Sequence, residues 1–341
     1  EEGNSLYEHD PYGSVKQASE QLTADQLDSY KLQFQSLAFS RIYERITGRQ
    51  YVALYGRKHA PKSFMWPADY FGQQFTVTTK ETHMLDIPPD HILPKVSGYG
   101  ATQAQREALN PYRDPGSLTL NITVLSVAPR VFEIRNFLSP SEAHHILELA
   151  AGMKLSRSTT EASGGSGAIS TEPATTRTSS GSWIARSRSP IIDSIIRRSA
   201  DLLKIDEAML RYRHKDESEL APDDNGPICE RLQLVHYAKG QKYTPHHDFT
   251  FPDTSDGQAS RFATVLFYLN EGMGGGETGF PRWMNSESGK TLKVVPEVGK
   301  AVLFYNQLPD GNYDDLSQHE ALPVTRGEKW LTNLWVWDPH G

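Results

Sequence analysis

Cysteine is almost absent from this chain of 341 residues, which carries Cys229 alone. One cysteine excludes an intrachain disulfide and a cysteine-based zinc site. No apolar run approaches the roughly 18 residues that a membrane helix needs, and no signal-peptide pattern is present. No basic block stands out, and the net charge of −7 argues against nucleic acid as a partner. What remains is an ordinary globular composition, with enough residues to build a core without disulfides.

The first residue and one glycosylation sequon bear on whether the chain passes through the secretory pathway. The chain begins at Glu1 rather than Met, so we expect that a signal or anchor segment has been removed. Asn121-Ile122-Thr123 is a glycosylation sequon, which is compatible with a secretory history, although such triplets also arise by chance.

Residues 1–117 are expected to form an N-terminal extension of unknown role. Thr23 and Gln26 fit a capping box, and the apolar residues that follow at helical spacing predict one amphipathic helix over 24–47. This helix packs on its own domain or forms a dimer contact. Residues 49–117 are rich in Pro, Tyr and His without a sustained period, which indicates an irregular segment wrapped around its neighbour.

Residues 118–341 show regular patterns and are expected to form one domain. Alternating residues predict strands over 118–124 and 131–134. Ser139-Pro140 and Ser189-Pro190 are helix-start signals, and Gly152 ends the first helix. After residue 227 the pattern is β throughout, which favours a sandwich or jelly-roll barrel. These later strands are expected over 232–237, 262–269, 292–295, 301–305 and 330–337.

A segment rich in Ser, Thr and Gly, residues 156–182, separates the two predicted helices. Long loops inside a compact domain are usually functional lids or disordered linkers. Because this one carries Arg157 and Arg177 toward Trp183, we interpret it as a lid, with a linker as the alternative.

The candidate chemistry centres on residues 243–248, Tyr-Thr-Pro-His-His-Asp. Residues two apart on a strand share a face and lie ~6.6 Å apart, so His246 and Asp248 can reach one ion while His247 points away. His319, just before the last predicted strand, is the candidate third ligand. Two His and one carboxylate form the facial triad of non-haem Fe(II) oxygenases. Taken alone, a His-x-Asp triplet equally fits a polar turn or a structural hydrogen bond.

Lys329 opens the apolar run that ends the chain. A lysine in a core strand is costly unless it meets an anion. We therefore interpret it as the group that binds the far carboxylate of a dicarboxylic co-substrate, with an outward-facing lysine as the alternative.

Four segments, in this order and spacing, resemble the catalytic domain of 2-oxoglutarate-dependent prolyl 4-hydroxylases over about residues 129–341. They are Arg-Thr-Ser-Ser-Gly at 177–181, the stretch 232–248, Gly-Gly-Glu-Thr-Gly-Phe-Pro at 275–281, and His319 with Lys329-Trp330. The resemblance implies an α+β fold with a double-stranded β-helix (jelly-roll) core and flanking helices.

The resemblance also implies roles for individual residues. Fe(II) is expected on His246, Asp248 and His319. Lys329 is expected to hold 2-oxoglutarate, with hydroxyls from Tyr237 and Thr278, and Trp335 is expected near the metal. Tyr243, Arg261 and Arg177 match positions associated with the peptide groove.

The implied activity is peptidyl-proline 4-hydroxylation. Fe(II), O₂ and 2-oxoglutarate would form 4-hydroxyproline in Pro-rich polypeptides, releasing succinate and CO₂, with ascorbate as reductant. The alternatives are a related oxygenase acting on another residue or a small molecule, and a catalytically silent binding or scaffold module. The oligomeric state is left open.

One departure from the family concerns the compartment. Where the family usually has Ala-Gly-Cys-Pro-Val after the distal His, residues 320–324 read Glu-Ala-Leu-Pro-Val, so the family's cysteine bridges are absent. No iron or co-substrate position is lost. The expected location is the lumen of the secretory pathway, in the endoplasmic reticulum or Golgi, and the cytoplasm is the alternative.

Overall fold

The computed structural model describes residues 63–88, 91–158, 176–215, 217, 226–249, 260–283, 290–309 and 311–338. The helix expected over 24–47 lies outside these residues, as does most of the lid expected over 156–182. Within the described ranges, no helix combines the length and apolar character needed to cross a bilayer.

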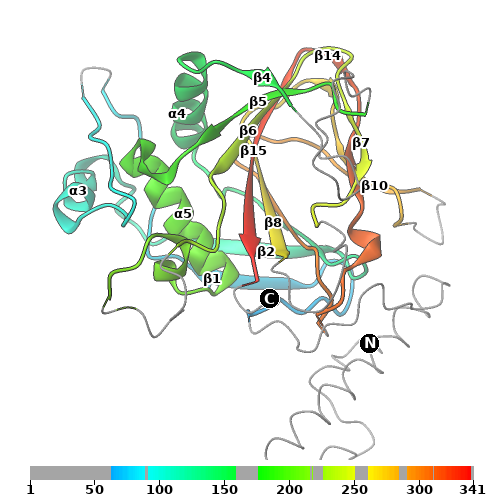
Figure 1. Ribbon diagram of the computed structural model, residues 1–341, viewed down its shortest axis with the longest axis horizontal. Helices are drawn as coiled ribbons and strands as arrows, with labels where there is room; N and C mark the ends of the chain where they lie inside the picture. The colour runs from blue at the N-terminus through cyan, green and yellow to red at the C-terminus, as the bar shows by residue number, and fades with distance from the viewer. Residues whose placement is uncertain are drawn as a thin grey trace, which may run out of the picture.

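In the described part of the chain, a nine-stranded sheet faces a smaller, four-stranded sheet, and helices cover the outer face of the larger one (Figure 1). The large sheet consists, in spatial order, of β1 (Gln74–Thr78), β2 (Thr119–Ser126), β3 (Val131–Ile134), β12 (Ala301–Tyr305), β8 (Arg261–Tyr268), β15 (Lys329–Trp337), β6 (Leu232–Tyr237), β5 (Ser180–Ile184) and β4 (Ser156–Arg157). The small sheet consists of β11 (Leu292–Val294), β10 (Thr278–Phe280), β13 (His319–Ala321) and β7 (Tyr243–His246). The strands pair antiparallel, and a short ladder joins β14 (Val324–Arg326) to β9 (Gly274–Gly275). The predicted α+β class with a jelly-roll core is confirmed, although the described strands form facing sheets rather than a closed barrel.

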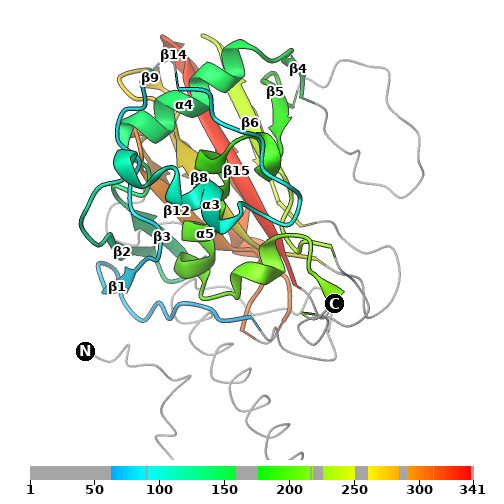
Figure 2. The same ribbon diagram turned by 90° about the vertical axis from the view of Figure 1, so that its left-hand side faces the viewer.

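Helix-start signals in the sequence place both long helices. Ser139 caps α4 (Pro140–Ala151) in a reciprocal capping box with Glu142. Ser189 accepts a hydrogen bond from the Ile192 N–H at the start of α5 (Pro190–Leu203). Both predicted starts are confirmed, and Figure 2 shows these helices lying against the large sheet. The shorter helices are α3 (Gln103–Glu107), η1 (Asn110–Tyr112), η2 (Arg186–Arg188), η3 (Glu207–Leu210) and η5 (Asp315–Ser317).

The large sheet separates two apolar cores, and alternation along β8 shows which residues face which. Val265 and Phe267 point toward the helices and belong to the larger core. Leu266 and Tyr268 point toward the small sheet and belong to the inner core. Cys229 is buried beside the larger core, where its thiol donates to the carbonyl of Leu210. The space between the two sheets is therefore where inward-pointing polar side chains can meet.

The upstream segment is more regular than its sequence indicates. β1 pairs with β2 in the register Val77↔Leu120 and extends the sheet, and Trp66 is buried with its Nε1–H donating to the Leu202 carbonyl at 2.8 Å. The strand escaped prediction because five residues with two apolar side chains are too short to establish a period. The proposed domain boundary at residue 118 stays a prediction.

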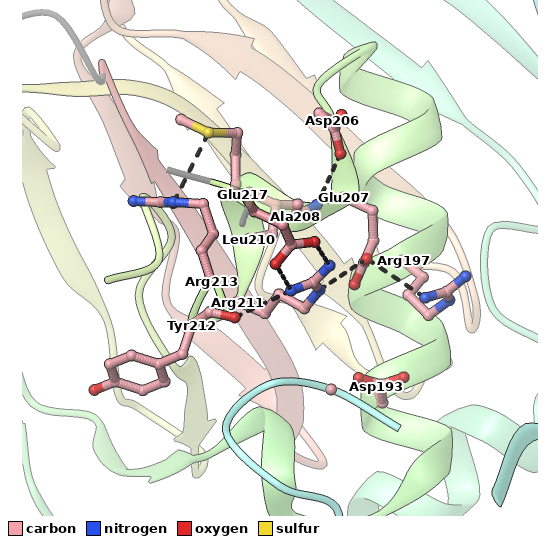
Figure 3. A network of polar contacts seen from close by, with 12 residues as sticks. Asp193, Arg197, Asp206, Glu207, Ala208, Leu210, Arg211, Tyr212, Arg213 and Glu217 are labelled. Carbon is pink, nitrogen blue, oxygen red and sulfur yellow. Dashed lines mark hydrogen bonds and ion pairs between the residues drawn. The ribbon is translucent and has the colours of Figure 1, made fainter. Parts of the chain in front are cut away.

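Ion pairs fasten this upstream segment to α5 and to the chain that follows it. Glu81 is buried and lies 2.6 Å from Nε of Arg197, which also approaches Glu207 at 3.5 Å. Arg211 continues the network by pairing with Glu207 at 3.1 Å and Glu217 at 2.6 Å (Figure 3). Its hydrogen bonds lower the pKa of Glu217 to about 2. Each carboxylate in this network therefore has a guanidinium partner.

Glu142 is expected to be a large contributor to the stability of the fold. It is fully buried, pairs with Arg198 at 2.7 Å and accepts the N–H groups of Met84 and Ser139. Glu142→Ala leaves a buried guanidinium without its counter-charge, which should lower the free energy of unfolding by ~3–5 kcal/mol. Glu148→Ala, on the same helix but 63% exposed, should cost less than ~0.5 kcal/mol. Denaturant titration measures both, and equal losses would contradict this account.

Candidate metal and co-substrate site

The structure brings the three predicted metal ligands together at one end of the small sheet. His246 on β7 and His319 on β13 are register partners, and Asp248 follows two residues after His246. One ligand atom from each lies within 4.8 Å of the others. Nε2 of His319 lies 3.6 Å from Oδ2 of Asp248, and Nε2 of His246 lies 3.9 Å from Oδ1.

Local hydrogen bonds leave the metal-facing nitrogens free. Nδ1 of His246 lies 2.9 Å from the Thr244 carbonyl, and Nδ1 of His319 lies 3.1 Å from that of Ser317. Because a carbonyl only accepts, Nδ1 donates in both rings, which turns Nε2 of each ring toward the site. Burial, with His319 nearby, holds the pKa of His246 well below its ordinary value. The imidazole of His246 is therefore neutral at physiological pH, as metal binding requires.

Asp248 provides the negative charge of the site. Its burial alone would raise the pKa, but His319 and His246, with Arg261 beyond them, outweigh burial and lower the pKa to about 2. A carboxylate with two imidazoles is a donor set that suits a divalent transition metal. The residues present therefore fit Fe(II).

His247 points away from the triad, as the strand alternation predicts. Its Nε2 lies 3.1 Å from the carbonyl of Asp315 on η5, and its ring packs against Phe249 with 4.6 Å between centroids. It contacts the segment leading to His319 without entering the ligand set.

Lys329 has an unusual environment for a lysine. It is fully buried opposite Tyr237 in the β15–β6 ladder. Its Nζ lies 5.5 Å from the ring centroids of Tyr237 and Tyr268 and has no hydrogen-bond partner among the described residues. Burial lowers its pKa to about 7, against a small opposing effect of Glu277. A buried amine without a partner is costly, so this position fits an anion such as a carboxylate of 2-oxoglutarate.

Two buried tyrosines lie beside the lysine, and one of them contacts Thr278. Tyr237 and Thr278 are both buried, and the hydroxyl of Tyr268 donates to that of Thr278 at 2.7 Å. Burial raises the pKa of Tyr237 to about 12, so its hydroxyl stays protonated and can donate. Tyr268 was missed from the sequence, although its position four residues after Thr264 on one strand puts it on the inward face.

Two glycines let a turn close over Lys329. Gly275 and Gly276 have φ values of +69° and +76°, which side-chain-bearing residues rarely adopt. A Cβ on Gly275 would lie 2.3 Å from the Pro323 carbonyl, and one on Gly276 would lie 3.4 Å from Cδ of Lys329. Gly275 therefore lets the turn pack against the Pro323 carbonyl, and the positive φ at both positions favours glycine.

The three predicted substrate residues lie next to the triad. The ring of Tyr243 stacks on His246 with 3.5 Å between centroids, and the guanidinium of Arg177 lies 4.6 Å above Tyr243. Arg261 covers the ring of Trp335 at 3.8 Å and donates to the Asp248 main-chain carbonyl at 3.1 Å. An aromatic and cationic rim thus borders the metal site.

Two neighbours of this rim were not predicted. Glu230 pairs with Arg261 at 2.6 Å, and Thr264 donates to Asp248 Oδ2 at 2.7 Å. Trp335 was expected near the metal, and its Nε1–H donates to the same oxygen at 2.9 Å. The sequence carries no local signal for Glu230, whose partner is brought to it by the β8–β15 pairing.

Comparison with known proteins gives consistent matches. A family model described as the 2OG-Fe(II) oxygenase superfamily matches residues 232–337. The chain is similar to probable prolyl 4-hydroxylase 3 of Arabidopsis thaliana, at 36% identity over 228 residues, covering 62% of this chain and 71% of that protein. Prolyl 4-hydroxylase 5 of the same plant is 35% identical over 229 residues, covering 63% and 70%.

Solved structures also show similarity. A viral collagen prolyl hydroxylase from Paramecium bursaria Chlorella virus-1, solved as a 2OG complex, has a TM-score of 0.43 at 23% identity and covers 61% of this chain and 95% of that one. A Trichoplax adhaerens prolyl hydroxylase, in complex with a peptide fragment of a hypoxia inducible factor, has a TM-score of 0.38 at 19% identity, covering 61% and 83%.

Proposed function

Because this chain belongs to the prolyl 4-hydroxylase family, we propose that it hydroxylates proline within Pro-rich polypeptides. It is a peptidyl-proline 4-hydroxylase that depends on Fe(II) and 2-oxoglutarate. The observation that supports the proposal most is a His-Asp-His triad beside a buried lysine that has no hydrogen-bond partner among the described residues. Succinate, CO₂ and 4-hydroxyproline are the products.

Different residues of the site bind the metal and the co-substrate. His246, Asp248 and His319 would hold Fe(II), and Lys329 would bind the far carboxylate of 2-oxoglutarate. When bound, Fe(II) and 2-oxoglutarate supply the O₂ chemistry that hydroxylates a C–H bond. The protein orients the co-substrate, excludes water and holds the reacting atoms close together in the correct orientation. Tyr237 donates from a buried hydroxyl, which stays protonated because burial raises its pKa to about 12.

The rim fits a Pro-rich chain. Proline has no N–H and a fixed φ near −65°, so such chains hold an extended polyproline II form before binding. Binding a preformed shape avoids much of the ordering cost. Tyr243 offers an aromatic face to a pyrrolidine ring. Arg261 and Arg177 offer donors to the exposed carbonyls of the peptide.

Peptide length should therefore control activity. We expect a Pro-rich decapeptide to have a lower KM than a tripeptide of the same composition, and free proline to be the poorest substrate, because each added residue can contact the rim. The measurement is succinate production against peptide concentration, with mass spectrometry for 4-hydroxyproline. A length-matched peptide without proline is the control. Free proline performing as well as the decapeptide would contradict the groove, and succinate that never depends on peptide would favour a small-molecule oxygenase.

We also propose the lumen of the endoplasmic reticulum or Golgi as the location, with ascorbate as reductant. The sequon supports this, because Asn121 is exposed on β2. Protein expressed through the secretory pathway should lose mass on endoglycosidase treatment, whereas Asn121→Gln should not. An unchanged mass for the unaltered chain would count against the lumen.

A further inference from the structure

The two oxygens of the Asp248 carboxylate have different surroundings. Oδ2 accepts hydrogen bonds from the Thr264 hydroxyl at 2.7 Å and the Trp335 indole at 2.9 Å. These two donors use both of its lone-pair directions. Oδ1 receives no hydrogen bond from the described residues and lies 3.9 Å from Nε2 of His246. Oδ1 is thus the oxygen with both lone pairs left for a metal ion, whereas Oδ2, which Nε2 of His319 approaches to 3.6 Å, already accepts two hydrogen bonds.

The direction of the Thr264 hydroxyl is set by a third residue. The side-chain amide of Asn306 donates from Nδ2 to Oγ1 of Thr264 at 3.0 Å. A hydroxyl has one proton, and an oxygen that already accepts from Asn306 directs that proton elsewhere, here onto Asp248. All three side chains are buried, so water does not compete for these bonds and each is strengthened by its neighbour.

Asn306 is also connected to the second ligand arm. Its N–H donates to the Phe262 carbonyl at 2.9 Å, and its own carbonyl accepts the N–H of Asp314 at 3.0 Å. Asp314 caps η5. The main-chain carbonyl of Ser317, the last residue of η5, accepts a hydrogen bond from Nδ1 of His319. One residue after β12 thus links the side chain of Asp248 to the backbone that carries His319.

We propose that Asn306 and Thr264 are positioning residues of the metal centre, which hold Asp248 so that it binds the metal through Oδ1 alone. The consequence is an open coordination position, because a carboxylate that bound with both oxygens would occupy a site needed by 2-oxoglutarate or O₂. This inference rests on the proposed metal site and adds two residues that neither the metal motif nor the co-substrate motif contains.

The first test uses the unaltered protein. Infrared difference spectra on adding Mn(II) to metal-stripped protein, with ¹³C-labelled aspartate, report the separation of the two carboxylate stretches. A carboxylate that binds the metal through one oxygen gives a wide frequency separation between the two stretches, and one that binds through both oxygens gives a narrow separation. A narrow separation would overturn the inference. Failure of the unaltered protein to bind Mn(II) at all would instead overturn the proposed function.

The second test removes the donors one at a time. Thr264→Val and Asn306→Leu conserve the side-chain volume. Each should weaken Mn(II) binding by ~10–100-fold, which is the usual cost of losing a partner of a metal ligand. Each should also narrow the separation of the two carboxylate stretches in the infrared spectrum. Thr264→Ser keeps the hydroxyl, so its affinity for Mn(II) should be close to that of the unaltered protein. Thr332→Val is the matched control, because Thr332 is equally buried on β15 and its hydroxyl has no partner among the described residues.

The outcomes separate positioning from mere stability. A structural role would lower the unfolding temperature of the metal-stripped variants while leaving Mn(II) affinity and the infrared separation unchanged, and that result would overturn the inference. Should Thr264→Val fail to fold, Asn306→Leu and the spectra of the unaltered protein still decide the matter.

Discussion

His246→Ala is expected to abolish 2-oxoglutarate turnover, while His247→Ala, one residue away, keeps it. His246 aims its unprotonated Nε2 at Asp248 and His319, and two remaining ligands hold a divalent ion weakly. His247 instead contacts the Asp315 carbonyl. Its removal should cost ~1 kcal/mol of stability for one lost hydrogen bond and leave the metal stoichiometry at one.

The two variants change neighbouring residues, the last of β7 and the one that follows it, so each controls for the other. Succinate production measures turnover, and titration of metal-stripped protein with Mn(II) measures binding. Asp248→Ala and His319→Ala should match His246→Ala in both measurements. A dead His247→Ala beside an active His246→Ala would mean that the register of β7 is wrong.

Lys329→Met should raise the KM for 2-oxoglutarate far more than the KM for peptide. Methionine fills the volume but leaves the carboxylate without a counter-charge, which costs ~3–5 kcal/mol and corresponds to an increase of roughly 150- to 4,000-fold in KM. The matched control is Lys300→Met, because Lys300 is buried too but pairs with Glu133 and Glu297. Its KM for 2-oxoglutarate should stay unchanged. Equal effects of Lys329→Met on both substrates would indicate a structural lysine.

The same lysine makes co-substrate binding depend on pH. Burial holds the pKa of Lys329 at about 7 in the free protein, and a bound carboxylate would raise it by stabilising the ammonium. Binding therefore takes up a proton above that pKa. Affinity should be constant below pH ~7 and fall by up to ~tenfold per unit above it. Calorimetry in two buffers of different ionisation enthalpy measures the proton uptake, and affinity that is level from about pH 6 to 9 would contradict it.

Local signals explain how much of the fold and the triad could be predicted. Ser139 and Ser189 mark the helix starts by their own hydrogen bonds to the first turn. Alternation over residues 243–248 predicts that His246 and Asp248 reach one site, and the structure brings them together. These features depend on residues within one turn or one strand. His319 was a candidate from its place just before the last predicted strand, and the resemblance then implied its role as third ligand.

The supporting residues depend on strand neighbours that no local pattern specifies. Thr264 looks like one member of an apolar run, and it becomes a partner of Asp248 because β8 lies between β12 and β15. Asn306 looks like the polar end of a strand. Glu230 meets Arg261 across 31 positions of sequence. Such contacts follow from sheet order, which is settled by long-range packing.

Cys229 determines how the molecule can be handled in labelling experiments. Burial raises the pKa of its thiol to about 12, so almost no thiolate is present at neutral pH, and thiolate is the form that reacts with maleimides and oxidants. The chain has no other cysteine. A cysteine introduced at an exposed position would therefore be the one thiol to accept a fluorophore or spin label. A single substitution would give an enzyme labelled at one chosen site, and two substitutions would give a pair of labels for distance measurements.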